Sequence, residues 1–345
     1  MNKLVRNLTT GLCIMALSVP TFAATTEKVQ TLTLDEAVSR AINSSDKKGM
    51  YGAYKAAYEQ KNKYNKDMFD PTYRTSVNQA RQNNYNLEHL DEKITYDTTS
   101  TYLDVVELQK KIEADKNTIG IKEKELAQAQ FKLKKGYGTQ LEVKQAENDL
   151  LTAKSTLSAD QSSLNNAVVD FKKLTNLDIT KYALETEFTL EPVSVPADKL
   201  QSHLDKSLTE YWNILRDNVD IQELGKLDLI GSEYGDYVMY ETNIKQANFN
   251  IEDAQKNLWV SVQKSYNNLD PLKNNVETLK AQKEMAATTL KATELRYNKG
   301  LVSKLDLEKQ QLAGQDLDQA IFTTTKNYIL TKMLIENPNI MMMSN

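Results

Sequence analysis

A seven-residue apolar repeat constrains this chain more than any other feature of its sequence. Before one glycine turn the repeat runs through Val105, Ile112, Ile119, Leu126 and Leu133, and after it through Val143, Leu150, Leu157, Leu164 and Phe171. A later stretch repeats it at Leu269, Val276, Leu290 and Tyr297, with Lys283 as the one break. Because seven residues fall short of two full turns of α-helix, such a repeat is typical of helices that supercoil around each other. The repeat therefore predicts long helices that pack in pairs along an apolar seam.

The turn that interrupts the repeat occurs twice. Gly136 and Gly300 lie 164 residues apart, each where the helical pattern ends, as expected for a residue that closes a helix with positive φ. Thr139 and Ser303 follow three residues later and can cap the returning helices. The same offset pairs Tyr102 with Tyr266, Leu108 with Leu272, Glu113 with Glu277, Leu126 with Leu290 and Leu141 with Leu305. We interpret this as an internal duplication of a long antiparallel helical hairpin.

The segment before the first hairpin predicts mixed structure. Thr33 can cap a helix that continues to about Asp67. The weak alternation of Thr72–Asn78 predicts one short strand, and Asn83–Asn86 is expected to be a loop. Helix should then resume near Leu90.

The second part of the chain repeats this order. Glu185–Pro196 predicts an extended segment, Asp198–Leu229 a shorter helix, Gly231–Gly235 a tight connection, and a second long hairpin follows from about Tyr266. We divide the chain into a first repeat at 24–178, a linker at 179–197 and a second repeat at 198–345. The fold class is all-α, with little or no β structure.

The first 23 residues are expected to be a signal peptide. Lys3 and Arg6 form a basic start, Leu12–Val19 is mostly apolar, and Ala23 ends a typical cleavage site. A lipid anchor on Cys13 is the alternative, although Leu12 is larger than the residue that normally precedes a lipidated cysteine. Cleavage would remove the one cysteine of the sequence, and the exported protein would have no disulfide.

Composition restricts the class of protein. The chain has 345 residues with 11 Gly, 6 Pro and a mean hydropathy of −0.57, which favours long solvated helices over a compact α/β enzyme. Its formal net charge of −4 becomes −6 without the signal peptide, so no electrostatic attraction to nucleic acid or to an anionic membrane is expected. The charged stretch Lys122–Glu125 is interpreted as solvated surface.

The sequence gives little support for catalysis. Its two histidines, His89 and His203, have no ligand-like spacing and are expected at the surface. Carboxylate pairs such as Asp35 and Glu36 arise by chance in a charged helix. We therefore predict no catalytic residue, no metal site and no cofactor.

Three segments resemble the TolC family of outer-membrane efflux channels. They are LTLDEAVSRAINSS from Leu32, TYLDVVELQKKIE from Thr101, and the tip motif from Tyr297 to Asp306. Each segment is weak evidence alone, but they occur in the family's order on a duplicated hairpin. The resemblance implies a homotrimer whose helices form a tunnel, with hairpin tips that face a membrane-fusion adaptor and an inner-membrane pump.

The resemblance also assigns the residues that would contact the adaptor. Carried over to this sequence, the docking tips are Gly136, Tyr137, Gly138, Gly300, Leu301, Val302 and Ser303. The alternative interpretation of the glycines is a plain helix cap, with docking through the backbone and side chains that the cap exposes.

The sequence departs from the family in its membrane strands. Two tilted membrane strands and a turn need roughly 22 residues, and the second half offers only Leu229–Tyr240. We therefore expect an exported protein of the cell envelope, periplasmic or cell-wall-associated, whose contact with an outer membrane does not use a full β-barrel. A second departure is that the first arm shows one strong seam, with a poor opposite flank at Leu103, Lys110 and Asn117. A coiled-coil scaffold without transport activity remains the alternative function.

Overall fold

The structure is a computed structural model that describes residues 30–64, 66–224 and 234–343. Its helices are α1 (Leu34–Ser44), α2 (Lys47–Asn62), α3 (Pro71–Lys134), α4 (Gln140–Thr175), α5 (Leu200–Leu224), α6 (Tyr234–Asn267), α7 (Leu269–Asn298) and α8 (Lys304–Glu336), with short 3-10 turns at Ile179–Lys181, Ala197–Lys199 and Pro338–Met342. The strands that the described residues form are β1 (Thr31–Leu32) and β2 (Ala183–Leu184), which pair in parallel. The predicted all-α fold with long antiparallel hairpins is confirmed.

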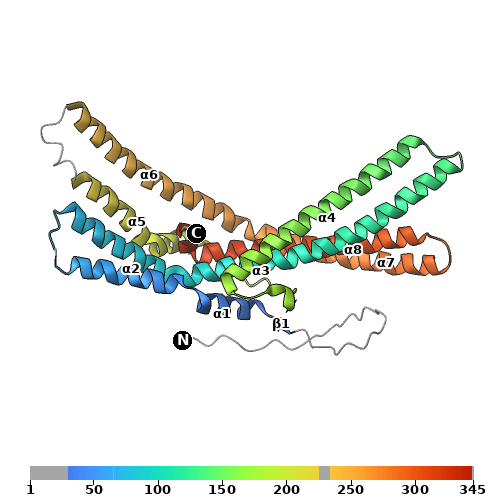
Figure 1. Ribbon diagram of the computed structural model, residues 1–345, viewed down its shortest axis with the longest axis horizontal. Helices are drawn as coiled ribbons and strands as arrows, with labels where there is room; N and C mark the ends of the chain where they lie inside the picture. Colours follow the sequence, from blue (N-terminus) through green and yellow to red (C-terminus); the bar gives the residue numbers. More distant parts are fainter. Residues whose placement is uncertain (1–29, 65, 225–233, 344–345) are drawn as a thin grey trace.

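Two helical hairpins extend to one end of the molecule. Helices α3 and α4 form the first, α7 and α8 form the second, and α3 packs against α8 between them. Their far ends separate at the right of Figure 1. The long helices thus follow the order α4, α3, α8, α7, which leaves α4 and α7 at the two edges of the layer.

Two further helix pairs extend the opposite way. The first part of α3 packs against α2, and α5 packs against α6. These pairs form the left-hand end of the molecule in Figure 1. The largest buried side chains lie between the two ends, where α1, the base of α3 and α4, α5 and the carboxy-terminal turn meet.

The structure corrects the predicted start of α3. Helix begins at Pro71, capped by Asp70, and continues unbroken through Thr72–Asn78 and Asn83–Asn86, where a strand and a loop were expected. The asparagines are satisfied inside the helix: Asn84 donates to Glu88 at 2.7 Å and accepts from Lys55 at 2.6 Å. Packing against α2 and α5 overrides the weak helix propensity of these residues.

Other boundaries also differ from expectation. The first helix ends at Ser44 and a second runs from Lys47 to Asn62, so one continuous helix to Asp67 is wrong. The capping box of Thr33 with Glu36 is present as expected. The predicted signal peptide and most of the Gly231–Gly235 connection lie outside the described residues.

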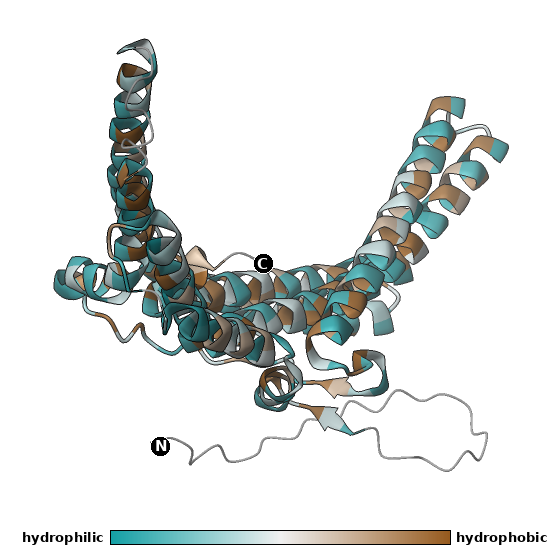
Figure 2. Cartoon of the chain, turned by 60° about the vertical axis from the view of Figure 1, so that its left-hand side comes forward, coloured by the Kyte–Doolittle hydropathy of each residue, from teal (hydrophilic) through white to brown (hydrophobic). Residues whose placement is uncertain are grey.

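The predicted seam is present, but it is only partly buried. Val105, Ile112, Val143 and Phe171 are buried, whereas Leu126 is half-buried and Tyr297 is exposed. Two helices alone cannot surround a side chain, so most seam residues between the core and the tips are half-buried, although Val143 beside the first tip is buried. Hydrophobic residues recur along the long helices (Figure 2).

Candidate functional site: the two hairpin tips

The two tips close their first helices with the same backbone motif. Gly136 has φ 82° and Gly300 has φ 70°, so each takes the left-handed conformation that favours glycine. The Gly136 amide donates to Leu133 O at 3.0 Å, and the Tyr137 amide donates to Lys132 O at 3.2 Å. In the second tip the Gly300 amide donates to Tyr297 O at 2.8 Å, and the Leu301 amide donates to Arg296 O at 2.9 Å. Both patterns are Schellman caps, in which the two residues after the helix satisfy its last carbonyls.

The returning helices are also capped alike. Thr139 accepts from the Glu142 amide, and the Glu142 carboxylate accepts from the Thr139 amide at 2.7 Å. Ser303 and Asp306 make the same reciprocal pair at the start of α8. These hydrogen bonds lower the pKa of both carboxyl groups, Glu142 through the Thr139 amide and Asp306 through the Ser303 hydroxyl. Each tip is therefore a rigid turn with its end groups satisfied on both sides.

The tips differ in the space available for a side chain at one position. A Cβ atom added to Gly138 would lie 2.7 Å from the Leu133 nitrogen and 2.9 Å from the Lys132 carbonyl carbon. The first turn thus folds back onto α3 so closely that only glycine fits. The equivalent residue of the second tip is Val302, so that turn follows a path with room for a side chain.

Both tips expose large apolar side chains at equivalent positions. Tyr137 and Leu301 are each 66% exposed. One and a half turns earlier, Phe131 and its equivalent Leu295 are also exposed. On the surface of a soluble protein, exposed large apolar side chains usually occur singly. Here each tip has two of them, at equivalent positions in the two hairpins.

Ion pairs join the two hairpins between the tips and the core. Lys124 of α3 pairs with Glu308 of α8, and Lys309 of α8 pairs with Glu125 of α3. Glu123 and Lys124 are exposed, as expected for solvated surface, but Lys124 and Glu125 also form ion pairs with α8. Closer to the core, the Lys326 ammonium group donates hydrogen bonds to Asp104 and Glu107, although burial removes much of its hydration. The second flank of α3, which looked poor in apolar residues, makes a polar interface with α8.

A groove separates the hairpins on this side of the molecule. Its volume is about 470 Å³, and polar side chains of α3 and α8 line it, among them Asn117, Lys124 and Gln315. Gly120 lines it as well, and nothing lies within 4 Å of the place of its absent Cβ. Two contacts cross the groove: Asn117 donates to Gln315 at 2.8 Å, and Lys124 pairs with Glu308.

The structure places the seven predicted site residues in the two turns, three in the first and four in the second. It does not bring the two turns together, because the hairpins diverge toward their ends (Figure 1). Phe131 and Leu295 are exposed near the tips but were not among the predicted site residues. Their shared offset of 164 residues was the available signal.

Both histidines lie deeper than expected. His89 is half-buried beside Tyr85 and lies 3.1 Å from Glu92. The Nε2 atom of His203 lies 3.1 Å from the carbonyl oxygens of Ile335 and Glu336, at the end of α8. Hydrogen bonds to neighbouring residues explain both positions.

The fold is that of solved outer-membrane channels. The CmeC channel of Campylobacter jejuni matches 89% of this chain over 85% of its own, with a TM-score of 0.60 at 13% identity. The open state of the Neisseria gonorrhoeae MtrE channel covers 89% of this chain and 88% of its own, with a TM-score of 0.55 at 10% identity. OprN, described as an outer-membrane channel, gives a TM-score of 0.56 at 10% identity, over 89% of this chain and 90% of its own. At these identities the similarity establishes the fold.

Sequence comparison matches one part of the chain to a family model. Residues 227–330, which include α7 and most of α8, match the family model described as outer membrane efflux protein. No curated protein matches the chain. The family match and the fold together confirm the resemblance to the TolC family of outer-membrane efflux proteins. Within the described residues, no helix has both the length and the hydrophobicity of a membrane span.

Proposed function

We propose that this protein is the conduit subunit of an envelope export system, which assembles as a homotrimer and docks an adaptor through its hairpin tips. The observation that carries the proposal is the matched pair of tips, with the same caps and with Tyr137 and Leu301 equally exposed. A hairpin that served only as a spacer would not need rigid apolar ends of the same kind. An adaptor's own helical hairpin would contact these ends and lie along the groove between α3 and α8, joining the conduit to a pump.

The ring is supported by the two edges of the helical layer. Leu151 and Val169 are exposed on α4, and Met285 and Leu295 are exposed on α7. Edge helices with unpartnered apolar side chains are expected to pack against another helix. In a closed ring, α4 of one protomer would cover α7 of the next. The two repeats, 24–178 and 198–345, would then contribute one hairpin each to the wall.

The ring can be tested by disulfide cross-linking, because Cys13 is the one native cysteine. Leu151 and Met285 lie at comparable distances along their helices from the tips, so cysteines at both positions should join neighbouring protomers. In a Cys13→Ser background we expect covalent trimers under oxidising conditions. Neither single-cysteine variant should give more than a dimer. A monomeric mass in solution with no cross-link would favour the scaffold function instead.

The docking role is tested by charge substitution at the tips. In cells that lack the native gene, the wild-type protein should restore efflux of a dye, and Tyr137→Glu or Leu301→Glu should abolish it. Phe249→Glu is the matched control, since Phe249 is similarly exposed on α6, away from the tips. Helicity and assembly should stay unchanged in all three variants. Transport at the wild-type level by the tip variants would show that the tips are only structural.

A further inference from the structure

Helix α2 has an outer face that the described part of the protomer leaves open. None of its 16 residues is buried. Its exposed residues from Gly49 to Gln60 are uncharged except for Glu59, which lines a cleft beside α3. The uncharged ones are Gly49, Met50, Ala53, Tyr54, Ala56, Ala57 and Gln60. A helix surface in water normally carries charged side chains, so this face has the composition of a contact with another helix.

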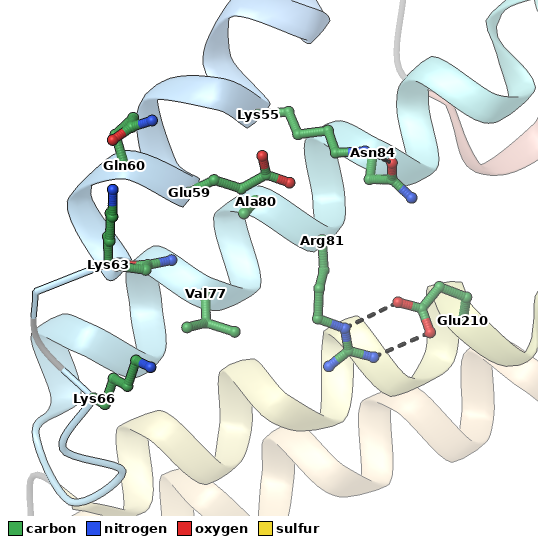
Figure 3. Close-up of a pocket in the computed structure, with 11 residues that line it drawn as sticks. Lys55, Glu59, Gln60, Lys63, Lys66, Val77, Ala80, Arg81, Asn84 and Glu210 are labelled. Carbon is green, nitrogen blue, oxygen red and sulfur yellow. Dashed lines mark hydrogen bonds and ion pairs between the residues drawn. The ribbon is translucent and has the colours of Figure 1, made fainter.

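Helix α2 is one border of a layer of four helices at the end opposite the tips. The helices α2, α3, α5 and α6 pack in this order. Figure 3 shows contacts that hold the first three together, with Lys55 beside Asn84 and Arg81 facing Glu210. Helix α6 is the other border, at the top of this end in Figure 1. Its residue Val260 is 47% exposed.

The borders of this layer continue the borders of the hairpin layer. Helix α1 packs against both α3 and α4 and leads into α2, so α2 and α4 lie on the same side of α3. At the other border α6 leads into α7 with Asn268 as the one residue between them. A neighbouring protomer that contacts the α4 and α7 borders therefore also comes close to the α2 and α6 borders.

We propose that α2 of one protomer packs along α6 of the next, so that the end opposite the tips closes as a second helical ring. The inference rests on the proposed function, since the neighbour is the protomer whose α7 is covered by α4. Small side chains such as Ala53 and Ala57 let another helix approach closely, and Val260 supplies a larger side chain at the contact. A head-to-tail contact of this kind repeats around a ring and leaves no border open.

Polar contacts across the layer indicate which residues lie level with each other. They are Lys55 with Asn84, Arg81 with Glu210 and Asp217, and Arg216 with Gln255. Along this series Ala57 is level with the part of α6 about one turn nearer the core than Gln255, close to Val260. A closed ring has no rise between protomers, so Ala57 and Val260 should meet across the contact. Phe249 lies about three turns farther out than Val260, beyond the end of α2, and stays outside the contact.

Disulfide cross-linking tests the contact on the protein purified after export, in the Cys13→Ser background. Val260→Cys combined with Ala57→Cys, or with Ala53→Cys one turn away, should give covalent trimers under oxidising conditions. The pair that reacts more completely identifies the register. Gln79→Cys with Val260→Cys is the matched control, because Gln79 is exposed on α3 inside the layer, and it should give no covalent trimer.

The hairpin pair Leu151→Cys/Met285→Cys separates failure of this inference from failure of the proposed function. Covalent trimers from the hairpin pair, with none from either α2–α6 pair, would overturn the inference and leave the conduit ring intact. Lipid or another protein would then cover the two borders. A monomeric mass with no trimer from any pair would overturn both.

Charge substitution gives a second measurement that does not depend on disulfide formation. Ala57→Glu/Val260→Glu places two carboxylates across the contact and should raise the dissociation constant of the ring by about tenfold or more in sedimentation equilibrium. Ala57→Lys/Val260→Glu places opposite charges there and should recover most of the loss. Phe249→Glu is the control and should assemble like the wild-type protein. Equal weakening by the two double variants, or none, would show that Ala57 and Val260 do not face each other in the ring.

Discussion

Tyr102 and Tyr266 hold equivalent positions in the two halves of the chain. The Tyr102 hydroxyl donates to Leu32 O at 2.7 Å, just before α1, and the Tyr266 hydroxyl donates to Val195 O at 3.0 Å, just before the helical segment that leads into α5. Each tyrosine thus fastens the entry of its own half to the base of its own hairpin. This shared contact supports the duplication beyond sequence spacing.

The two tyrosines should differ in their contribution to stability. Tyr102 is fully buried and its hydroxyl also accepts from the Glu185 amide at 2.7 Å, whereas Tyr266 is half-buried. Burial raises the pKa of Tyr102 to about 12, so the hydroxyl stays protonated near neutral pH. Tyr102→Phe should destabilise the protein by about 1–3 kcal/mol, because it leaves the buried Leu32 carbonyl and the half-buried Glu185 amide without this partner. Tyr266→Phe should cost less, since water can replace the lost hydroxyl, and urea unfolding will measure both.

The seam predicts a gradient of sensitivity along α3. Val105→Asp buries an unpaired carboxylate and should cost several kcal/mol, whereas Leu126→Asp should cost less because Leu126 is half-buried. Lys144→Asp, at an exposed position of α4, should change stability by under about 0.5 kcal/mol. Denaturant unfolding of the three variants gives the order. Equal losses at Leu126 and Lys144 would contradict the assigned register.

The polar interface between α3 and α8 should depend on Lys326. Desolvation lowers the pKa of Lys326, but hydrogen bonds with Asp104 and Glu107 outweigh it and the pKa is raised. Lys326→Met leaves two carboxylates facing each other without their cation and should cost about 1–3 kcal/mol. Lys280→Met, which breaks an exposed pair with Glu277 on α7, should cost under about 1 kcal/mol. If both changes cost the same, the interface is not held by Lys326.

The helical hairpins could be predicted from the sequence more completely than the polar contacts between them. The Gly136 and Gly300 caps and the Val105 seam could be predicted because glycine conformation and apolar spacing leave direct local patterns. The first turns of α3 could not, since the asparagines around Asn84 favour loops until α2 and α5 pack against them. The α3–α8 interface was missed for a related reason. Lys326 and Glu107 look like ordinary surface charges, and only the fold brings them together across 219 residues.

The hairpin seam contains a carboxyl pair that should make its stability depend on pH. Asp160 of α4 is 7% exposed and accepts from Lys111 at 2.9 Å, beside Asp115 of α3. Burial and a hydrogen bond with Asp160 raise the pKa of Asp115 from 3.8 to about 6, although Lys111 opposes the shift. Glu107 also faces Lys111.

The sign follows from proton binding. The folded protein holds the Asp115 proton more tightly than the unfolded chain does, so stability falls as pH rises from about 4 to about 6. Asp115→Asn keeps a hydrogen-bonding side chain and removes this ionisation. The variant should therefore be more stable than the wild type above pH 6, by less than about 1 kcal/mol because the site is partly open to solvent. Thermal unfolding at pH 4 and pH 7 checks this: an equal difference at both values would exclude Asp115 as its source.

The two tips should respond differently to reciprocal exchanges of glycine and valine. Gly138→Val places a Cβ atom within 2.7 Å of the Leu133 nitrogen, so the first turn must open to admit it. The Schellman hydrogen bond from the Tyr137 amide to Lys132 O should then weaken, and amide hydrogen exchange of Tyr137 should accelerate tenfold or more. Val302→Gly makes the reciprocal change at the second tip and introduces no contact. Its cost should be under about 1 kcal/mol, from the added freedom of glycine in the unfolded chain, with little change in exchange at Leu301. Equal acceleration at both tips would show that the close approach at Gly138 does not set the path of the first turn.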